Sequence, residues 1–152
     1  MRVSFAVDGH RHVLDAVPDR RLIDILREDL DIMGPKQSCG VGRCGACLVI
    51  MDDRPINACL VMAARLEGAE ITTVAGLGPE ADRVRDALAQ SGAVQCGYCA
   101  SGWMTLLTWL LGKSPLPTAA EAETLLSGQL CRCTGYGGIR RALAKLLPSD
   151  VR

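Results

Sequence analysis

The sequence predicts an α+β protein with a mixed N-terminal half and a helical C-terminal half. Apolar residues alternate with polar or small ones at the start of the chain, which is typical of strands. Apolar residues at helical spacing are common in the second half. A turn-rich stretch, Gly76-Leu77-Gly78-Pro79, separates the two patterns. We therefore expect two domains, residues 1–76 and residues 77–152.

Two strands and a helix are expected before the first cysteine. Residues 3–7 alternate in the manner of a strand, Asp8-Gly9 is typical of a hairpin turn, and a second strand runs through residues 13 and 14. Asp19 can cap a helix that Gly34-Pro35 ends. The apolar positions of this helix have helical spacing: Leu22, Ile25, Leu26 and Leu30.

The rest of the first half is predicted to be a loop and two strands. Three cysteines lie on a glycine-rich loop. Residues 48–51 then form an apolar run typical of a strand, with a turn at residues 52–55. A last strand is expected over residues 71–74.

The second half is predicted to contain four short helices, which suggests a small bundle. Thr118 and Glu121 have the spacing of a capping box at the start of the third helix, and Pro148 ends the fourth. The second helix is largely apolar, so we expect it to be central to this half. The helices are expected over residues 83–90, 100–111, 118–126 and 139–147.

The composition excludes several kinds of partner. The chain has 17 Lys and Arg against 17 Asp and Glu, so it has no basic field to attract nucleic acid. It lacks the apolar run of about 7–15 residues found in signal peptides. Its apolar stretch at residues 103–111 is too short to span a bilayer. We therefore expect a cytoplasmic protein without a membrane span.

The eight cysteines form two groups of four. In a chain without a secretory signal, reduced thiols are expected, which argues against a disulfide scaffold and favours metal ligation. We call Cys39, Cys44, Cys47 and Cys59 the first cysteine group, and the second cysteine group is Cys96, Cys99, Cys131 and Cys133.

The first cysteine group has the C-x4-C-x2-C spacing of plant-type ferredoxins, which hold one [2Fe–2S] cluster. Gly40, Gly42 and Gly45 would let the loop wrap around a cluster with positive φ angles. Two alternatives are weaker. The G-x-G-x-x-G match over residues 40–45 lacks the strand-to-helix context of a dinucleotide site. A zinc site favours paired cysteine knuckles over this triple run.

The second cysteine group is ambiguous when it is considered alone. A zinc ribbon also uses two pairs of cysteines, so the spacing leaves iron–sulfur and zinc comparable. Cys96-Gly97-Tyr98-Cys99 formally matches a thioredoxin-like redox pair. That motif needs a βαβ context, and this half is predicted to be helical.

Taken together, the motifs resemble those of a known family. They are, in order, Cys39-Gly40-Val41-Gly42-Arg43-Cys44-Gly45-Ala46-Cys47, Cys59, Gln95-Cys96-Gly97-Tyr98-Cys99, and Cys131-Arg132-Cys133-Thr134-Gly135-Tyr136. This pattern resembles the small iron–sulfur subunit of the xanthine dehydrogenase family of molybdenum hydroxylases, over nearly the whole chain. Residues 37–38, 100–103 and 137–138 depart from the commonest family pattern without removing a cysteine.

The resemblance implies a β-grasp, plant-ferredoxin-like domain followed by a four-helix bundle. Each domain would hold one [2Fe–2S] cluster through its four cysteines. It also implies an electron-transfer subunit with no substrate site of its own. A large partner subunit would carry a molybdenum–pterin cofactor, and a medium subunit would carry FAD. Such a complex is a hetero-oligomer, for example a dimer of heterotrimers.

The resemblance also implies an order of electron transfer. Electrons would leave the molybdenum for the cluster of the second cysteine group, then pass to that of the first group and on towards FAD. Gln95 and Cys133 would lie against the pterin. The alternative is a stand-alone ferredoxin-like carrier, which would have no need of a pterin contact. His10 and His12 are expected to be surface or strand residues, because both groups already have four thiols.

Overall fold

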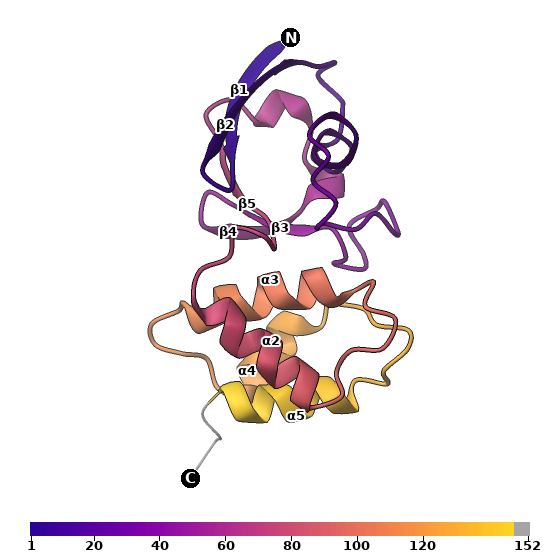
Figure 1. Ribbon diagram of the computed structural model, residues 1–152, viewed down its shortest axis with the longest axis vertical. Coiled ribbons are helices and arrows are strands. Elements are labelled where there is room, and N and C mark those ends of the chain that lie inside the picture. The colour runs from indigo at the N-terminus through magenta and orange to yellow at the C-terminus, as the bar shows by residue number, and fades with distance from the viewer. Residues whose placement is uncertain (148–152) are drawn as a thin grey trace.

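A five-stranded mixed sheet organises the N-terminal half of the computed structural model, which describes residues 1–147 (Figure 1). Its strands are β1 (Arg2–Val7), β2 (His10–Asp15), β3 (Leu48–Met51), β4 (Arg54–Asn57) and β5 (Glu70–Thr72). They lie in the order β2-β1-β5-β3-β4. Two antiparallel hairpins thus flank β5, which runs parallel to β1 and antiparallel to β3. This sheet and the helices that follow it confirm the predicted α+β class.

The first hairpin is confirmed, but the helix after it differs from the prediction. The helix α1 (Leu22–Asp24) is short and continues as a π-helical turn, Ile25–Asp29. Asp19 does not cap it, because the preceding residue is Arg21 and no side chain caps the helix. The N–H of Leu22, a donor that a cap would satisfy, instead binds the carbonyl of Val61 at 2.8 Å.

The strand β4 was not predicted, because a longer turn was expected over residues 52–55. The turn consists only of Asp52 and Asp53, which have φ angles of 49° and 63°. Pro55 lies within β4, paired with Ile50. β4 is an edge strand, where a residue without an N–H is tolerated.

Four helices follow in the described part of the second half, and they lie close to the predicted ranges. The capping box is confirmed: Glu121 N donates to Thr118 Oγ1 at 3.3 Å, and Thr118 N donates to the Glu121 carboxylate at 2.9 Å. Pro148, predicted to end the last helix, lies outside the described residues. The helices are α2 (Glu80–Gln90), α3 (Ala100–Leu111), α4 (Ala119–Leu126) and α5 (Gly137–Leu146).

The two halves form two lobes, with α3 lying between the sheet and the other helices (Figure 1). One face of α3 buries Trp103, Leu107 and Leu110 in the helical core. Its other contacts are with β3 and β4, and Trp109 Nε1 donates to the carbonyl of Asp53 at 2.9 Å. The helix that was expected to be central therefore also forms the seam between the lobes.

Hydrogen bonds to Asp8 hold the start of the connection from β5 to α2. The Asp8 carboxylate accepts hydrogen bonds from the backbone N–H and the hydroxyl of Thr73, at 2.7 and 2.6 Å. The domain boundary between residues 76 and 77 falls in this connection and stays a prediction. Across residues 1–147, no helix has the length and apolar character needed to cross a membrane.

Candidate cluster-binding sites

The first cysteine group lies on a loop that wraps back towards one short turn. Cys39, Cys44 and Cys47 lie between the π-helical turn and β3, and Cys59 lies in a 3-10 turn, Ala58–Leu60. Gly42 has a φ angle of +73°, and a Cβ atom there would lie 2.3 Å from Leu60 Cδ1. Because glycine adopts positive φ angles without steric cost, the loop can close over Cys59.

Backbone N–H groups point at the sulfurs of the first group. Gly42 N donates to Cys59 Sγ at 3.3 Å, and Arg43 N donates to Cys39 Sγ at 3.2 Å. The N–H of Val41, with that of Arg43, lowers the pKa of Cys39 to about 6. Burial raises the pKa of Cys47 to about 12, so a metal ion bound there would have to displace its proton.

The second cysteine group brings two distant motifs together. Cys96 and Cys99 directly precede α3, and Cys131 and Cys133 lie between α4 and α5. The sulfurs of Cys96 and Cys133 are 3.5 Å apart and exposed. Cys99 and Cys131 form a second, more buried pair. Each iron of a [2Fe–2S] cluster takes two protein ligands, so two pairs of thiols are the arrangement that such a cluster needs.

The thiols of the second group differ in their surroundings. Burial raises the pKa of Cys99 to about 12. At Cys131, burial is the largest influence and opposes ionisation, but hydrogen bonds from Thr134, Cys133 and Cys99 together lower the pKa. The Cys96 thiol raises the pKa of Cys133. Among residues 1–147, no three His, Cys, Asp or Glu side chains are grouped so as to hold a single metal ion.

A cavity of about 640 Å³ lies where the two groups approach each other. Cys44 lines it from the first group, and all four cysteines of the second group line it from the other side. A second cavity of about 10 Å³, roughly one water molecule in size, is bordered by the same four second-group cysteines. The thiols of the second group therefore form two close pairs that border open space, which fits a ligand held between the pairs.

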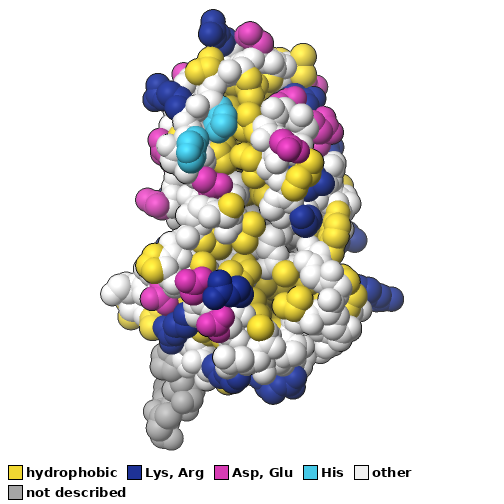
Figure 2. All heavy atoms as spheres, viewed as in Figure 1, with side chains coloured by type: hydrophobic (Ala, Val, Ile, Leu, Met, Phe, Trp, Pro, Cys, Tyr) yellow, Lys and Arg dark blue, Asp and Glu magenta, His cyan; other side chains and the backbone are white. Residues whose placement is uncertain are grey.

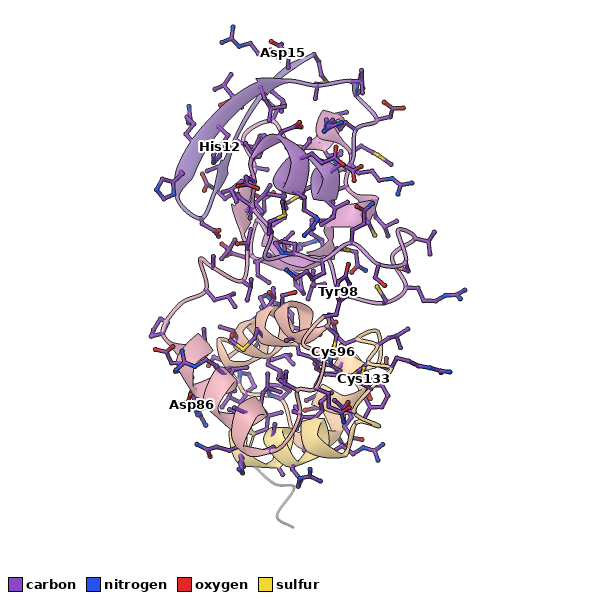
Figure 3. The ribbon with its side chains drawn as sticks, turned by 45° about the vertical axis from the view of Figure 1, so that its right-hand side comes forward. His12, Asp15, Asp86, Cys96, Tyr98 and Cys133 are labelled. Carbon is purple, nitrogen blue, oxygen red and sulfur yellow. The ribbon has the colours of Figure 1, made fainter. Side chains whose placement is uncertain are left out.

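Two hydrogen bonds and one packing contact hold the two cysteine loops together. Leu130 N donates to the carbonyl of Cys44 at 2.9 Å. Tyr98 Oη donates to the carbonyl of Gln37, and Figure 3 shows Tyr98 at the seam, pointing towards the sheet. Gln129 is 3% exposed and lies so near Gly45 that a Cβ there would be 2.1 Å from its Oε1. Cysteine spacing carried no signal for these three contacts.

The residues predicted to meet a pterin lie on the surface of the helical lobe. Gln95, Cys96 and Cys133 are all exposed. Cys96 and Cys133 lie side by side at the edge of this lobe (Figure 3). His12 belongs to β2 on the sheet lobe, away from that edge, and His10 begins the same strand. The two histidines therefore lie where they were expected, at a distance from the second cysteine group. Both are on the surface of the sheet lobe (Figure 2).

Two alternatives from the sequence do not fit this fold. The loop over residues 40–45 leads into β3, so it does not connect a strand to a helix as a dinucleotide site requires. Cys96 and Cys99 follow α2, with no βαβ unit around them. Neither a dinucleotide site nor a thioredoxin-like motif is present in these segments.

Comparisons with known proteins match both lobes. Residues 5–73 match the family described as "2Fe-2S iron-sulfur cluster binding domain", and residues 73–144 match the "[2Fe-2S] binding domain". The chain is 43% identical to the "Xanthine dehydrogenase iron-sulfur-binding subunit" of Escherichia coli O157:H7, over 88% of this chain and 86% of the relative. It is 36% identical to the "Nicotinate dehydrogenase small FeS subunit" of Eubacterium barkeri, over 93% and 91%.

The fold of this chain also matches solved structures of two oxidoreductases. Quinoline 2-oxidoreductase from Pseudomonas putida contains a chain with a TM-score of 0.84 and 37% identity, covering 94% of this chain and 90% of that one. The aldehyde oxidoreductase of Desulfovibrio desulfuricans matches with a TM-score of 0.85 and 33% identity. The match covers 93% of this chain but only 16% of that longer one.

The fold and the two cysteine groups define an iron–sulfur, electron-transfer protein with two [2Fe–2S] binding domains. The chain belongs to the family of small iron–sulfur subunits of the xanthine dehydrogenase type, the molybdenum hydroxylases. The match over residues 73–144 resolves the choice between iron–sulfur and zinc in favour of a [2Fe–2S] cluster. The relatives are subunits of oxidoreductases, which favours membership of a complex over a stand-alone carrier.

Proposed function

We propose that this chain carries electrons from a molybdenum–pterin centre on a large partner subunit, through two [2Fe–2S] clusters, towards FAD on a medium subunit or another acceptor. The observation that carries the proposal is the single cavity shared by Cys44 and the second cysteine group. Two cofactor sites that open onto one cavity suit a relay. A substrate would instead bind on the large subunit.

The ligands of the two clusters follow from this proposal. The first cysteine group would hold one cluster on the sheet lobe, and the second cysteine group would hold the other on the helical lobe. The paired thiols of the second group and the backbone N–H groups near the first group support this assignment. The cluster itself supplies one-electron chemistry, and the chain supplies its position and its polar surroundings.

Electrons would enter at the exposed edge of the helical lobe. Cys96 and Cys133 are exposed there, next to the exposed amide of Gln95. An amide can both donate to and accept from a pterin edge, which suits Gln95 to that contact. The first cysteine group then lies across the seam and would pass electrons on.

The proposed electron relay requires partner subunits. We expect a hetero-oligomer in which this chain joins the large molybdenum–pterin subunit, together with a medium FAD subunit, in the form of a dimer of heterotrimers. The cytosol keeps cysteines reduced and available to bind iron, so we propose that the complex is cytoplasmic. The relatives named as subunits of nicotinate, nicotine and aldehyde enzymes support such an assembly.

Electron paramagnetic resonance of the dithionite-reduced protein tests this function, with iron and labile sulfide counted on the same sample. We expect two distinct [2Fe–2S] signals and about four irons per chain, two for each cluster. The large subunit should co-purify with the chain. One signal, with zinc making up the difference in metal, would contradict the relay.

A further inference from the structure

The hydroxyl of Thr134 contacts the sulfur of Cys131. Oγ1 lies 3.1 Å from Sγ, and the same oxygen accepts the backbone N–H of Tyr136 at 3.3 Å. A hydroxyl has one proton and two lone pairs. Because the Tyr136 N–H occupies a lone pair, the proton of the hydroxyl remains available for the sulfur. A cysteine that binds iron is a thiolate without a proton, so Thr134 would be the donor.

The turn around Thr134 is closed by its own hydrogen bonds. Tyr136 adopts a left-handed conformation with φ 65°, and its hydroxyl accepts the N–H of Cys131 at 2.8 Å. The Tyr136 ring packs edge-on against Trp103, with centroids 6.4 Å apart. These contacts hold the Thr134 hydroxyl against Cys131.

Backbone N–H groups approach sulfurs of both cysteine groups, for example those of Gly42 and Arg43 in the first and that of Cys133 in the second. Over residues 1–147, Thr134 is the one residue whose hydroxyl donates to a cysteine sulfur. A single side chain can therefore tune one cluster without changing the other.

We propose that Thr134 raises the reduction potential of the cluster held by the second cysteine group. This inference rests on the proposed function, in which that cluster receives electrons first. Reduction adds one electron, and hence one negative charge, to the cluster. No covalent bond forms or breaks, and the hydroxyl keeps its proton. A hydrogen bond to the thiolate stabilises the more negative reduced state, so it favours electron entry from the molybdenum centre.

Thr134→Val tests the proposal, because valine keeps the shape of threonine and removes the hydroxyl. The purified complex is titrated with dithionite at defined potentials, and the two clusters are followed separately by electron paramagnetic resonance. The ratio of reduced to oxidised second-group cluster, at a fixed potential, should fall by up to about tenfold, the effect of one lost hydrogen bond. The first-group cluster should not change.

Two control variants separate the hydroxyl from the turn. Thr134→Ser keeps the O–H donor and should keep the potential of the wild-type protein. Tyr136→Phe removes the acceptor for Cys131 N–H and should weaken the turn without shifting the potential. Thr134→Ala provides a second variant without the hydroxyl, should the Val variant assemble poorly.

Several outcomes would overturn the proposal. One is an unchanged second-group potential in a Val or Ala variant that holds its full iron. Another is an equal shift in Tyr136→Phe, which would make the turn the cause. Loss of second-group iron from both the Val and Ala variants, but not from Ser, would make the hydroxyl an assembly requirement and not a redox determinant. Absence of two clusters from the wild-type protein would instead refute the proposed function itself.

Discussion

Leu130 donates its backbone N–H to the carbonyl of Cys44 at 2.9 Å, which joins the two cysteine loops directly. Leu130 immediately precedes Cys131, so this bond lies next to the second cysteine group. Around it, Gln129 fills the space between Gly45 and Gly102. The separation of the two cysteine groups therefore depends on close packing along the seam.

Gly102→Ala should loosen this seam. A Cβ atom at Gly102 would lie 2.4 Å from the carbonyl oxygen of Gly45, a backbone atom that cannot move alone. Alanine improves the helix propensity by about 1 kcal/mol, but overpacking costs about 1–3 kcal/mol. We expect a net loss of stability of up to about 2 kcal/mol, measured by chemical unfolding of the iron-loaded protein. The magnetic interaction between the two reduced clusters should also change.

Gly128→Ala is the matched control for that variant. A Cβ atom at Gly128 meets nothing within 4 Å. The same chemical change should therefore alter stability by no more than about 0.5 kcal/mol. Equal effects of the two substitutions would contradict the role of the Gly45–Gly102 approach.

Trp109→Phe should weaken the contact between α3 and the sheet lobe. The substitution removes the Nε1–H that donates to the carbonyl of Asp53 at 2.9 Å and keeps an aromatic ring. Loss of one such bond should cost about 0.5–1.5 kcal/mol in unfolding free energy. Lys113 Nζ lies 3.8 Å from the Trp109 ring, so Lys113→Gln measures the cation–π part separately. A Trp109→Phe loss no larger than that of Lys113→Gln would mean that the hydrogen bond adds nothing.

Cys44→Ser should remove one cluster selectively. Serine replaces a thiolate with a weaker ligand for iron, so the first-group signal and about two irons per chain should be lost. The second-group signal should persist, because its four thiols come from other segments. The rate of electron exit should fall sharply, and steady-state turnover of the complex measures it. Val41→Ala, an exposed change on the same loop, is the control. Normal turnover without the first-group cluster would rule out a relay through it.

Gln95→Ala should slow electron transfer from the molybdenum to the second-group cluster. Its exposed amide is proposed to hydrogen-bond the pterin, and loss of one bond corresponds to up to about a tenfold change. Rapid-reaction spectroscopy measures the rate, and the iron content should stay the same. Val94→Ala, the adjacent exposed residue, should leave the rate unchanged. An unaltered rate in Gln95→Ala would show that the pterin contact lies elsewhere.

Local patterns predicted most of the secondary structure. The alternation before Asp8-Gly9, the apolar run that became β3 and the Thr118 capping box depend only on neighbouring residues, and all three are confirmed. The cap at Asp19 was wrong, because a tertiary bond from Leu22 N to the Val61 carbonyl replaced it. β4 was missed because proline disfavours strands except at an edge, and only the assembled sheet defines its edges.

The sequence by itself determined the two cysteine groups, the glycine-rich loop and the family, because ligand spacing is local and specific. The tertiary structure alone decided that Cys96 pairs with Cys133 across 37 positions and that Leu130 meets Cys44. Contacts between distant segments leave no periodic trace in a sequence. They arise only when the packed lobes bring particular donors and acceptors within hydrogen-bond distance.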